Sequence, residues 1–167
     1  MDVRRKFIYL LQIPAIGIEL VFMVKDFDKS FFENPWFVGS VLGIFFVTLN
    51  FLFLKELYGF IRNKHNKREV FWELLFVVVT GISNIFIFAT TFYFFGIQDQ
   101  RGTLIQDFIS SLYFSVATWT TLGYGDFSPI PQLRLIASFE ALIGYTYMAI
   151  LIGLFLSVVK IEITEDG

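Results

Sequence analysis

Seven consecutive residues in the last third of the chain have the types and the spacing for cation binding: Thr120, Thr121, Leu122, Gly123, Tyr124, Gly125 and Asp126. A cation that has lost its water shell needs other oxygen ligands, and successive backbone carbonyls supply them when they point the same way. That geometry requires dihedrals that alternate between the right-handed and left-handed regions, and glycine enters the left-handed region freely. Glycines at alternate positions therefore predict a loop whose carbonyls bind cations.

The segments around this loop must hold it at a defined depth. An apolar segment lies on each side, and an aromatic-rich stretch of residues 104–119 directly precedes the loop. This stretch predicts a short helix, because it lacks the roughly 20 apolar residues that a crossing requires. We expect it to enter and leave the membrane on one side. Non-helical backbone such as the loop is tolerated at membrane depth where it lines a wet cavity.

The composition indicates a membrane protein. The chain has 167 residues, of which 56% are hydrophobic and 17% charged, whereas about a quarter of a soluble domain is charged. The net charge of −2 gives no electrostatic footprint for nucleic acid. The absence of cysteine excludes disulfides, thiolate catalysis and cysteine–zinc sites.

Four segments are long and apolar enough to cross a bilayer: residues 7–24, 36–54, 71–95 and 134–159. The prediction is an all-α integral membrane protein with four transmembrane helices and the re-entrant helix and loop between helices 3 and 4. Residues 1–70 form a helical hairpin with a basic loop, residues 71–160 form the domain that holds the cation-binding loop, and residues 161–167 are a short acidic tail. The hairpin has no ladder of arginines for voltage sensing, so we expect it to pack around the second domain.

The orientation follows from lysine and arginine, which gather at the N-terminus and in the loop between the second and third spans. The positive-inside rule places both in the cytoplasm. Four crossings then return the C-terminus to the cytoplasm, and the loop of residues 120–126 enters from outside. We expect this topology in the plasma membrane.

The loop and the residues before it resemble the selectivity filter and pore helix of the tetrameric potassium channels of the pore-loop family. The likeness rests on residues 120–126 and on the preceding aromatic pair, Tyr113 and Phe114, with its Ser-Val continuation, and it covers about residues 103–159. It implies a homotetramer that conducts potassium ions passively and needs no organic cofactor. Residues 71–95 would be the outer helix and residues 134–159 the inner helix.

The resemblance also assigns roles within the loop. The permeant potassium ion would be coordinated by the backbone carbonyls of four residues: Thr121, Leu122, Gly123 and Tyr124. Gly125 would complete the alternation of dihedrals, and Asp126 would lie at the outer mouth. The Tyr124 ring would point away from the axis and brace the loop against the pore helix.

Three departures from the family pattern concern the support of the filter. Phe114 stands where many relatives have a tryptophan, and phenylalanine has no N–H to donate to Tyr124 or Asp126. Ala117 stands where some bacterial relatives have a glutamate, and Trp119 is bulkier than the residue usual there. These departures predict a differently braced filter with altered inactivation.

Candidate gating residues lie in the last span. Gly144 is either a hinge or a site of close helix packing, and Gly153 is a second hinge candidate. Four residues recur at helical spacing and share one face: Tyr145, Ala149, Ile152 and Leu156. Placed by the resemblance, this face either lines the central cavity and inner constriction or packs against the outer helix.

Two features concern the surroundings of the pore. Glu140 is an ionisable residue inside a span, and we expect it to bond to hydroxyls of the pore helix. The basic segment between Lys55 and Arg68 either lies on the inner leaflet and binds anionic lipid or is a solvated turn.

The function predicted from these residues is a potassium-selective channel rather than an enzyme. The alternatives are a weakly selective cation pore and a regulatory, non-conducting subunit. A secondary transporter is less well supported, because paired repeats with broken helices are not visible.

Overall fold

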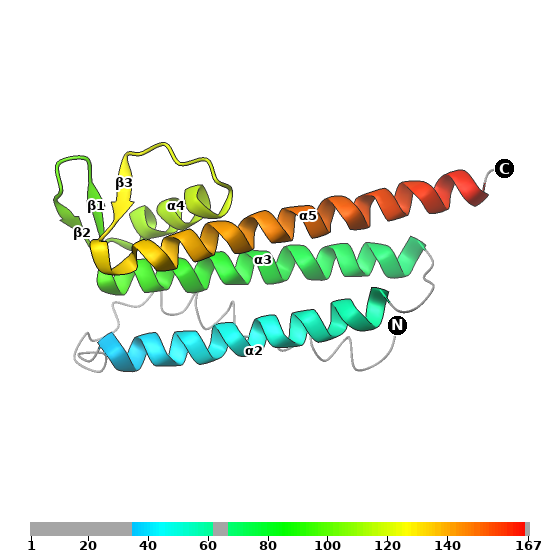
Figure 1. Ribbon diagram of the computed structural model, residues 1–167, viewed down its shortest axis with the longest axis horizontal. Helices are drawn as coiled ribbons and strands as arrows, with labels where there is room; N and C mark the ends of the chain where they lie inside the picture. The colour runs from blue at the N-terminus through cyan, green and yellow to red at the C-terminus, as the bar shows by residue number, and fades with distance from the viewer. Residues whose placement is uncertain (1–34, 62–66, 166–167) are drawn as a thin grey trace.

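The computed structural model describes residues 35–61 and 67–165, and long helices make up most of this part of the chain (Figure 1). Its elements run in the order α2 (Pro35–Ile61), α3 (Lys67–Phe95), β1 (Ile97–Asp99), β2 (Leu104–Ile105), α4 (Phe108–Trp119), β3 (Phe127–Pro129), the 3-10 turn η2 (Pro131–Leu133) and α5 (Arg134–Glu165). The predicted first span, residues 7–24, lies outside the described residues.

Three of the described helices are long and apolar enough to cross a membrane: Ser40–Phe60, Arg68–Phe95 and Pro131–Ser157. The chain is therefore a membrane protein, as its composition predicts. Helix α4 has 12 residues, about 18 Å at 1.5 Å per residue, which is too short to span the hydrocarbon core. The prediction of a short helix between two spans is confirmed.

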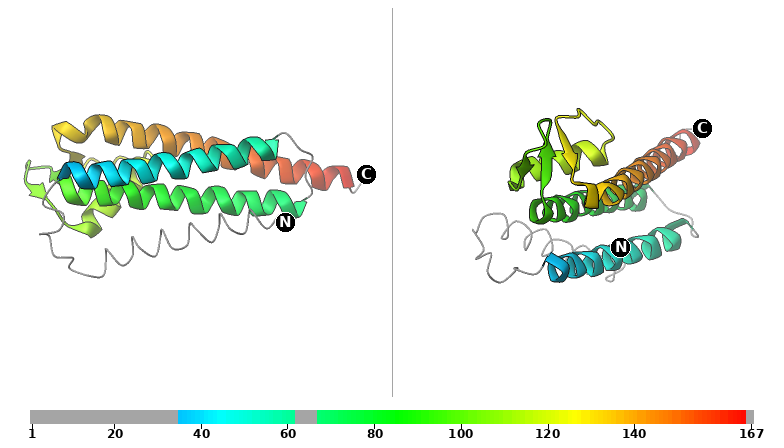
Figure 2. Two further views of the ribbon diagram at one scale, coloured as in Figure 1. Left: turned by 90° about the horizontal axis from the view of Figure 1, so that it is seen from below. Right: turned by 60° about the vertical axis from the view of Figure 1, so that its left-hand side comes forward.

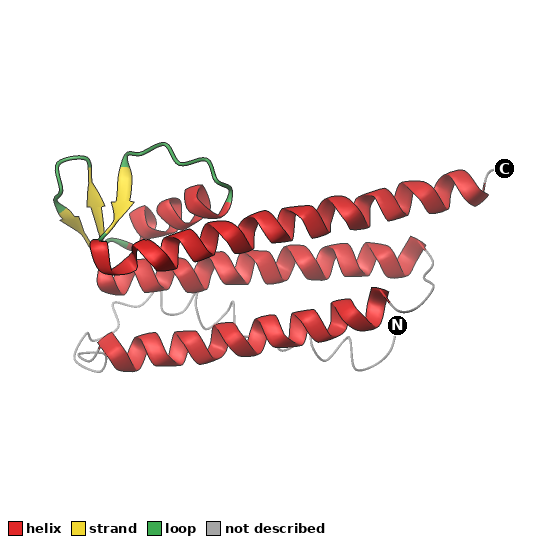
Figure 3. Cartoon of the chain, in the orientation of Figure 1, coloured by secondary structure: helices red, strands yellow, loops and turns green. Residues whose placement is uncertain are grey.

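The described part is mostly helical, as predicted, and it also contains a small sheet that was not predicted (Figure 3). The strands lie in the order β2-β1-β3, and both pairings are antiparallel. Ile97 faces Ile105 on one side and Pro129 on the other. The sheet thereby ties the end of α3, the approach to α4 and the segment after the loop of residues 120–126 into one unit.

Several predicted boundaries need correction. The short helix begins at Phe108 rather than at residue 104, because residues 104–105 pair with β1 and Asp107 caps the helix. The span predicted at 36–54 continues to Ile61, with Phe60 buried, and the span predicted to begin at 71 begins at Lys67. The span predicted to end at 159 continues to Glu165, through most of the expected tail, since no glycine or proline occurs there to break it.

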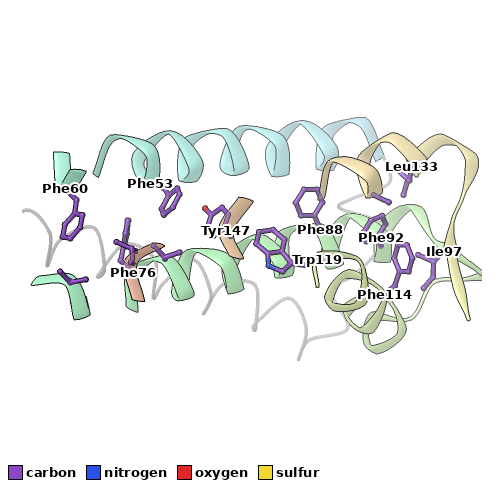
Figure 4. Close-up of a cluster of buried hydrophobic side chains, with 14 residues drawn as sticks. Phe53, Phe60, Phe76, Phe88, Phe92, Ile97, Phe114, Trp119, Leu133 and Tyr147 are labelled. Atoms are coloured by element: carbon purple, nitrogen blue, oxygen red, sulfur yellow. The ribbon is translucent and has the colours of Figure 1, made fainter. Parts of the chain in front are cut away.

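Helix α3 is the centre of the packing and contacts α2, α4 and α5 (Figures 1 and 2). This confirms that the second predicted span packs around the domain that holds the loop. The shared core is aromatic and runs the length of the bundle (Figure 4). Near the sheet, Phe92 of α3 and Phe114 of α4 meet edge to face with centroids 4.8 Å apart.

Candidate ion pathway

Helix α4 has a well-defined start. The carboxylate of Asp107 accepts hydrogen bonds from the backbone N–H groups of Ile109, at 3.3 Å, and Ser110, at 2.8 Å. Hydrogen bonding to the side chain of Ser110, and to a smaller extent to its backbone N–H, holds the pKa of Asp107 below its ordinary value. The charged form of Asp107 therefore caps the helix and complements its positive N-terminal end.

The C-terminal end of α4 holds the loop that follows. The N–H of Thr121 donates to the carbonyl of Thr118 at 3.0 Å, and the N–H of Leu122 donates to the carbonyl of Ala117 at 2.9 Å. The N–H of Gly123 approaches the same Ala117 carbonyl at 3.4 Å. Because these donors point back toward the helix, the first half of the loop is fixed to the negative end of the α4 dipole, which favours a cation nearby.

The loop backbone alternates in handedness, as the cation-binding prediction requires. Three residues at alternate positions have positive φ: Thr121 at 57°, Gly123 at 53° and Gly125 at 78°. Glycine accepts such angles freely, but Thr121 is β-branched and is the one non-glycine residue in the described part of the chain with positive φ. Strain held at such a position is typical of functional sites.

Tyr113 of α4 supports the second half of the loop. Its ring stacks on the ring of Tyr124 with centroids 6.4 Å apart and planes 10° apart, and it meets Phe127 edge to face at 5.9 Å. Its hydroxyl interacts electrostatically with the side chain of Asp126. The prediction that Tyr124 braces the loop against the short helix is confirmed, but the sequence analysis did not identify Tyr113 as the brace.

The three residues predicted to support the loop have different roles. Phe114 is buried against Phe92 of α3 and does not contact the loop through a ring interaction. Ala117 supplies the carbonyl that receives two loop N–H groups. The buried ring of Trp119 packs against Tyr147 of α5, with centroids 5.3 Å apart. Of the three, Ala117 therefore bonds to the loop directly, while Phe114 and Trp119 anchor α4 to α3 and α5.

The predicted gating glycines differ in their surroundings. A Cβ atom on Gly144 would overlap the carbonyl oxygen of Trp119 and lie 2.9 Å from its carbonyl carbon. A Cβ atom on Gly153 would meet nothing within 4 Å. The geometry supports the close-packing interpretation of Gly144, while the hinge interpretation of either glycine stays a prediction.

The predicted cavity face of α5 is uncovered in the single chain. Its members are all exposed: Tyr145, Ala149, Ile152 and Leu156. The exposed fractions of Tyr145 and Leu156 are 72% and 59%. No described residue of the same chain covers this face, and both the cavity interpretation and the packing interpretation stay predictions.

Glu140 of α5 is fully buried and contacts α4, as predicted. Its Oε1 is in hydrogen-bond contact with the Ser115 hydroxyl, which also lies 2.9 Å from the carbonyl oxygen of Ile85 in α3. One hydroxyl proton cannot serve both acceptors. A neutral Glu140 that donates to Ser115 would free the Ser115 proton for Ile85, so that the three helices share one polar chain. The second carboxyl oxygen, Oε2, has no hydrogen-bond partner among the described residues.

Comparison with known proteins agrees with the geometry. Residues 80–160 match a protein-family model described as "Ion channel". The match begins within α3 and includes the sheet, α4, the loop and most of α5. No curated protein and no solved structure matches the chain.

Proposed function

Through residues 80–160 the chain belongs to the ion-channel family, and we propose that this channel is potassium-selective and works as a homotetramer. The chain is a passive channel and not an enzyme. In the proposal, four copies of the loop meet at an axis and coordinate potassium through the carbonyls of residues 121–124. Asp126 lies at the outer mouth.

The alternating backbone of the loop is the observation that carries this proposal. Positive φ at residues 121, 123 and 125 lets the intervening carbonyls take the common direction that an ion path requires. The loop also starts at the C-terminal end of a helix too short to span the membrane, where the helix dipole favours a cation.

Uncovered surfaces support the tetramer. Leu122 and Tyr124 of the loop are 56% and 67% exposed, and the face of α5 with Tyr145 is also uncovered. One loop supplies ligands from one side only, so further copies must complete the coordination of an ion. In the tetramer the face with Tyr145, Ala149, Ile152 and Leu156 lines the cavity below the filter, and Gly144 and Gly153 remain the gating candidates.

We extend the proposal to the position in the membrane. The charge pattern places both termini in the cytoplasm and the filter toward the outside of the plasma membrane. Lipid surrounds the apolar helices, and the basic segment between Lys55 and Arg68 is the candidate contact with anionic headgroups.

The test is single-channel recording of the purified protein in planar bilayers with asymmetric potassium and sodium. A reversal potential near the potassium equilibrium value is the expected result. A reversal potential near zero would instead identify a weakly selective cation pore. Silence at all voltages, together with no potassium flux into vesicles, would favour a regulatory subunit.

Two glycine variants make a matched control. Gly125 and Gly102 have φ values of 78° and 79°, and a Cβ atom on either would meet nothing within 4 Å. An alanine therefore introduces the same backbone strain at both positions, about 1–2 kcal/mol. Gly125→Ala should abolish selective conduction, whereas Gly102→Ala, at the tip of the β1–β2 hairpin, should conduct like the natural protein.

A further inference from the structure

Three polar side chains from three helices meet in the middle of the bundle. The hydroxyl of Tyr147 in α5 donates to Oδ1 of Asn50 in α2 at 3.0 Å. The amide of Asn50 donates to Oδ1 of Asn84 in α3 at 3.0 Å, and the amide of Asn84 approaches the Tyr147 hydroxyl at 3.2 Å. We name these residues the polar triad. Each lies well inside a candidate membrane span.

Two members of the polar triad are buried among aromatic side chains, and Asn50 is partly buried. Asn84 is 0% exposed and Tyr147 is 4% exposed. The ring of Phe53, in α2, stacks on Tyr147 with centroids 4.7 Å apart and planes 17° apart. Unpaired polar groups are costly in such surroundings, so each member of the triad depends on the position of the other two.

Tyr147 also touches the base of the filter loop. Its ring packs against Trp119 of α4 on one side and against Phe53 of α2 on the other. Figure 4 shows Tyr147 between these two rings. Gly81 of α3 lies beside both rings, since a Cβ atom there would be in ordinary van der Waals contact with Tyr147, at 3.5 Å, and with Trp119, at 3.6 Å. Trp119 is followed directly by Thr120 and by the strained Thr121.

Association of the three helices does not by itself require a hydrogen-bonded triad. Helices in a membrane associate through close packing of apolar and small side chains, and polar groups add directional bonds to that packing. The hydroxyl of Tyr147 bonds to α2 and α3, while the same ring supports Trp119. The ring that contacts the base of the loop is therefore oriented by a helix outside the matched channel segment.

We propose that α2 is a positioning element for the selectivity filter. Asn50 holds Tyr147, Tyr147 holds Trp119, and Trp119 holds the first residues of the loop in the conducting form. This inference rests on the proposed function, because it assigns α2 a role in keeping the pore conductive. Asn50 and Tyr147 are positioning residues and do not touch the ion.

The test is a double-mutant cycle on single-channel open probability and on the potassium-to-sodium permeability ratio. Tyr147→Phe removes only the hydroxyl, and Asn50→Leu removes the amide at similar volume. One interhelical hydrogen bond in a membrane protein shifts an equilibrium about threefold to tenfold, so each variant should lower open probability by that factor. The double variant should be no worse than either single variant.

Thr48→Val is the matched control on the same helix. The Thr48 hydroxyl is exposed and bonds at 2.8 Å to the carbonyl of Ile44 in its own helix. This variant should leave open probability and permeability unchanged. Additive effects of Asn50→Leu and Tyr147→Phe on gating would overturn the inference. Lower unfolding temperatures with unchanged gating would overturn it too, and would show that the polar triad only holds the helices together.

A fluorescence measurement separates this inference from the proposed function. The chain has three tryptophans, so Trp36→Phe and Trp72→Phe leave Trp119 as the only reporter. Asn50→Leu and Tyr147→Phe should each shift its emission maximum, and Thr48→Val should not. If the emission maximum shifts but the parent protein carries no selective current, potassium selectivity is contradicted and the role of α2 is not. If the parent protein carries selective current but the variants change neither emission nor gating, the role of α2 is contradicted and potassium selectivity is not.

Discussion

The backbone carbonyl of Trp119 lies against Gly144, in a contact that leaves no room for a Cβ atom. This contact joins the last residue of α4 to the middle of α5, directly before the filter loop. Helix α5 and the base of the loop of residues 120–126 therefore cannot move independently at this point.

Gly144→Ala should destabilise the protein because its methyl group meets a backbone atom, which cannot rotate away. Overpacking of this kind costs about 1–3 kcal/mol. Thermal unfolding in detergent should show a clear loss, while Gly153→Ala, in open space, should be neutral or slightly stabilising since alanine favours helix. Equal stability of the two variants, with slowed opening of Gly144→Ala alone, would favour the hinge interpretation.

Asp107→Ala should lower the stability of α4 by about 1 kcal/mol, because two N-terminal N–H groups lose their acceptor. The folded protein lowers the pKa of Asp107, so its capping contribution is complete above the ordinary value of 3.8 and is lost as pH falls through the lowered value. Unfolding temperatures between pH 2 and pH 7 check this dependence. Asp107→Asn should keep most of the cap and show less loss in acid.

The residue types of the loop were enough to predict the left-handed backbone at Gly123 and Gly125 and the attachment of the loop to a short helix. They did not predict positive φ at Thr121, because threonine disfavours that region and only the surrounding hydrogen bonds impose it. The sheet was missed because strands of two and three residues carry too little alternation to be recognised. Pairing between them depends on contacts far apart in the sequence.

The polar triad was missed for a related reason. Asn50 and Asn84 are visible as amides within apolar spans, which is a signal of an interhelical contact. A single sequence does not show that they lie at one depth and face Tyr147. By contrast, the contact of Glu140 with a hydroxyl of α4 could be predicted, because an ionisable residue inside a span requires a polar partner.

Tyr113→Phe should weaken the outer part of the loop, because it removes the hydroxyl that interacts with Asp126 and keeps the stack on Tyr124. We expect inactivation to accelerate several-fold in this variant. Macroscopic current decay after channel opening measures this rate. Tyr113→Leu removes the stack as well and should be more severe. Unchanged decay in Tyr113→Phe would show that the stack alone braces the loop.

Glu140→Gln should retain the fold, because a side-chain amide can donate to Ser115 as a neutral carboxylic acid does. We expect its stability to stay within about 1 kcal/mol of the natural protein. Glu140→Ala removes the donor and leaves a cavity between three helices, so it should cost about 2–4 kcal/mol. Thermal unfolding of both variants provides the comparison. If Glu140→Gln were as damaging as Glu140→Ala, the buried group would have to be a carboxylate, and the shared polar chain through Ser115 to Ile85 would need a different proton arrangement.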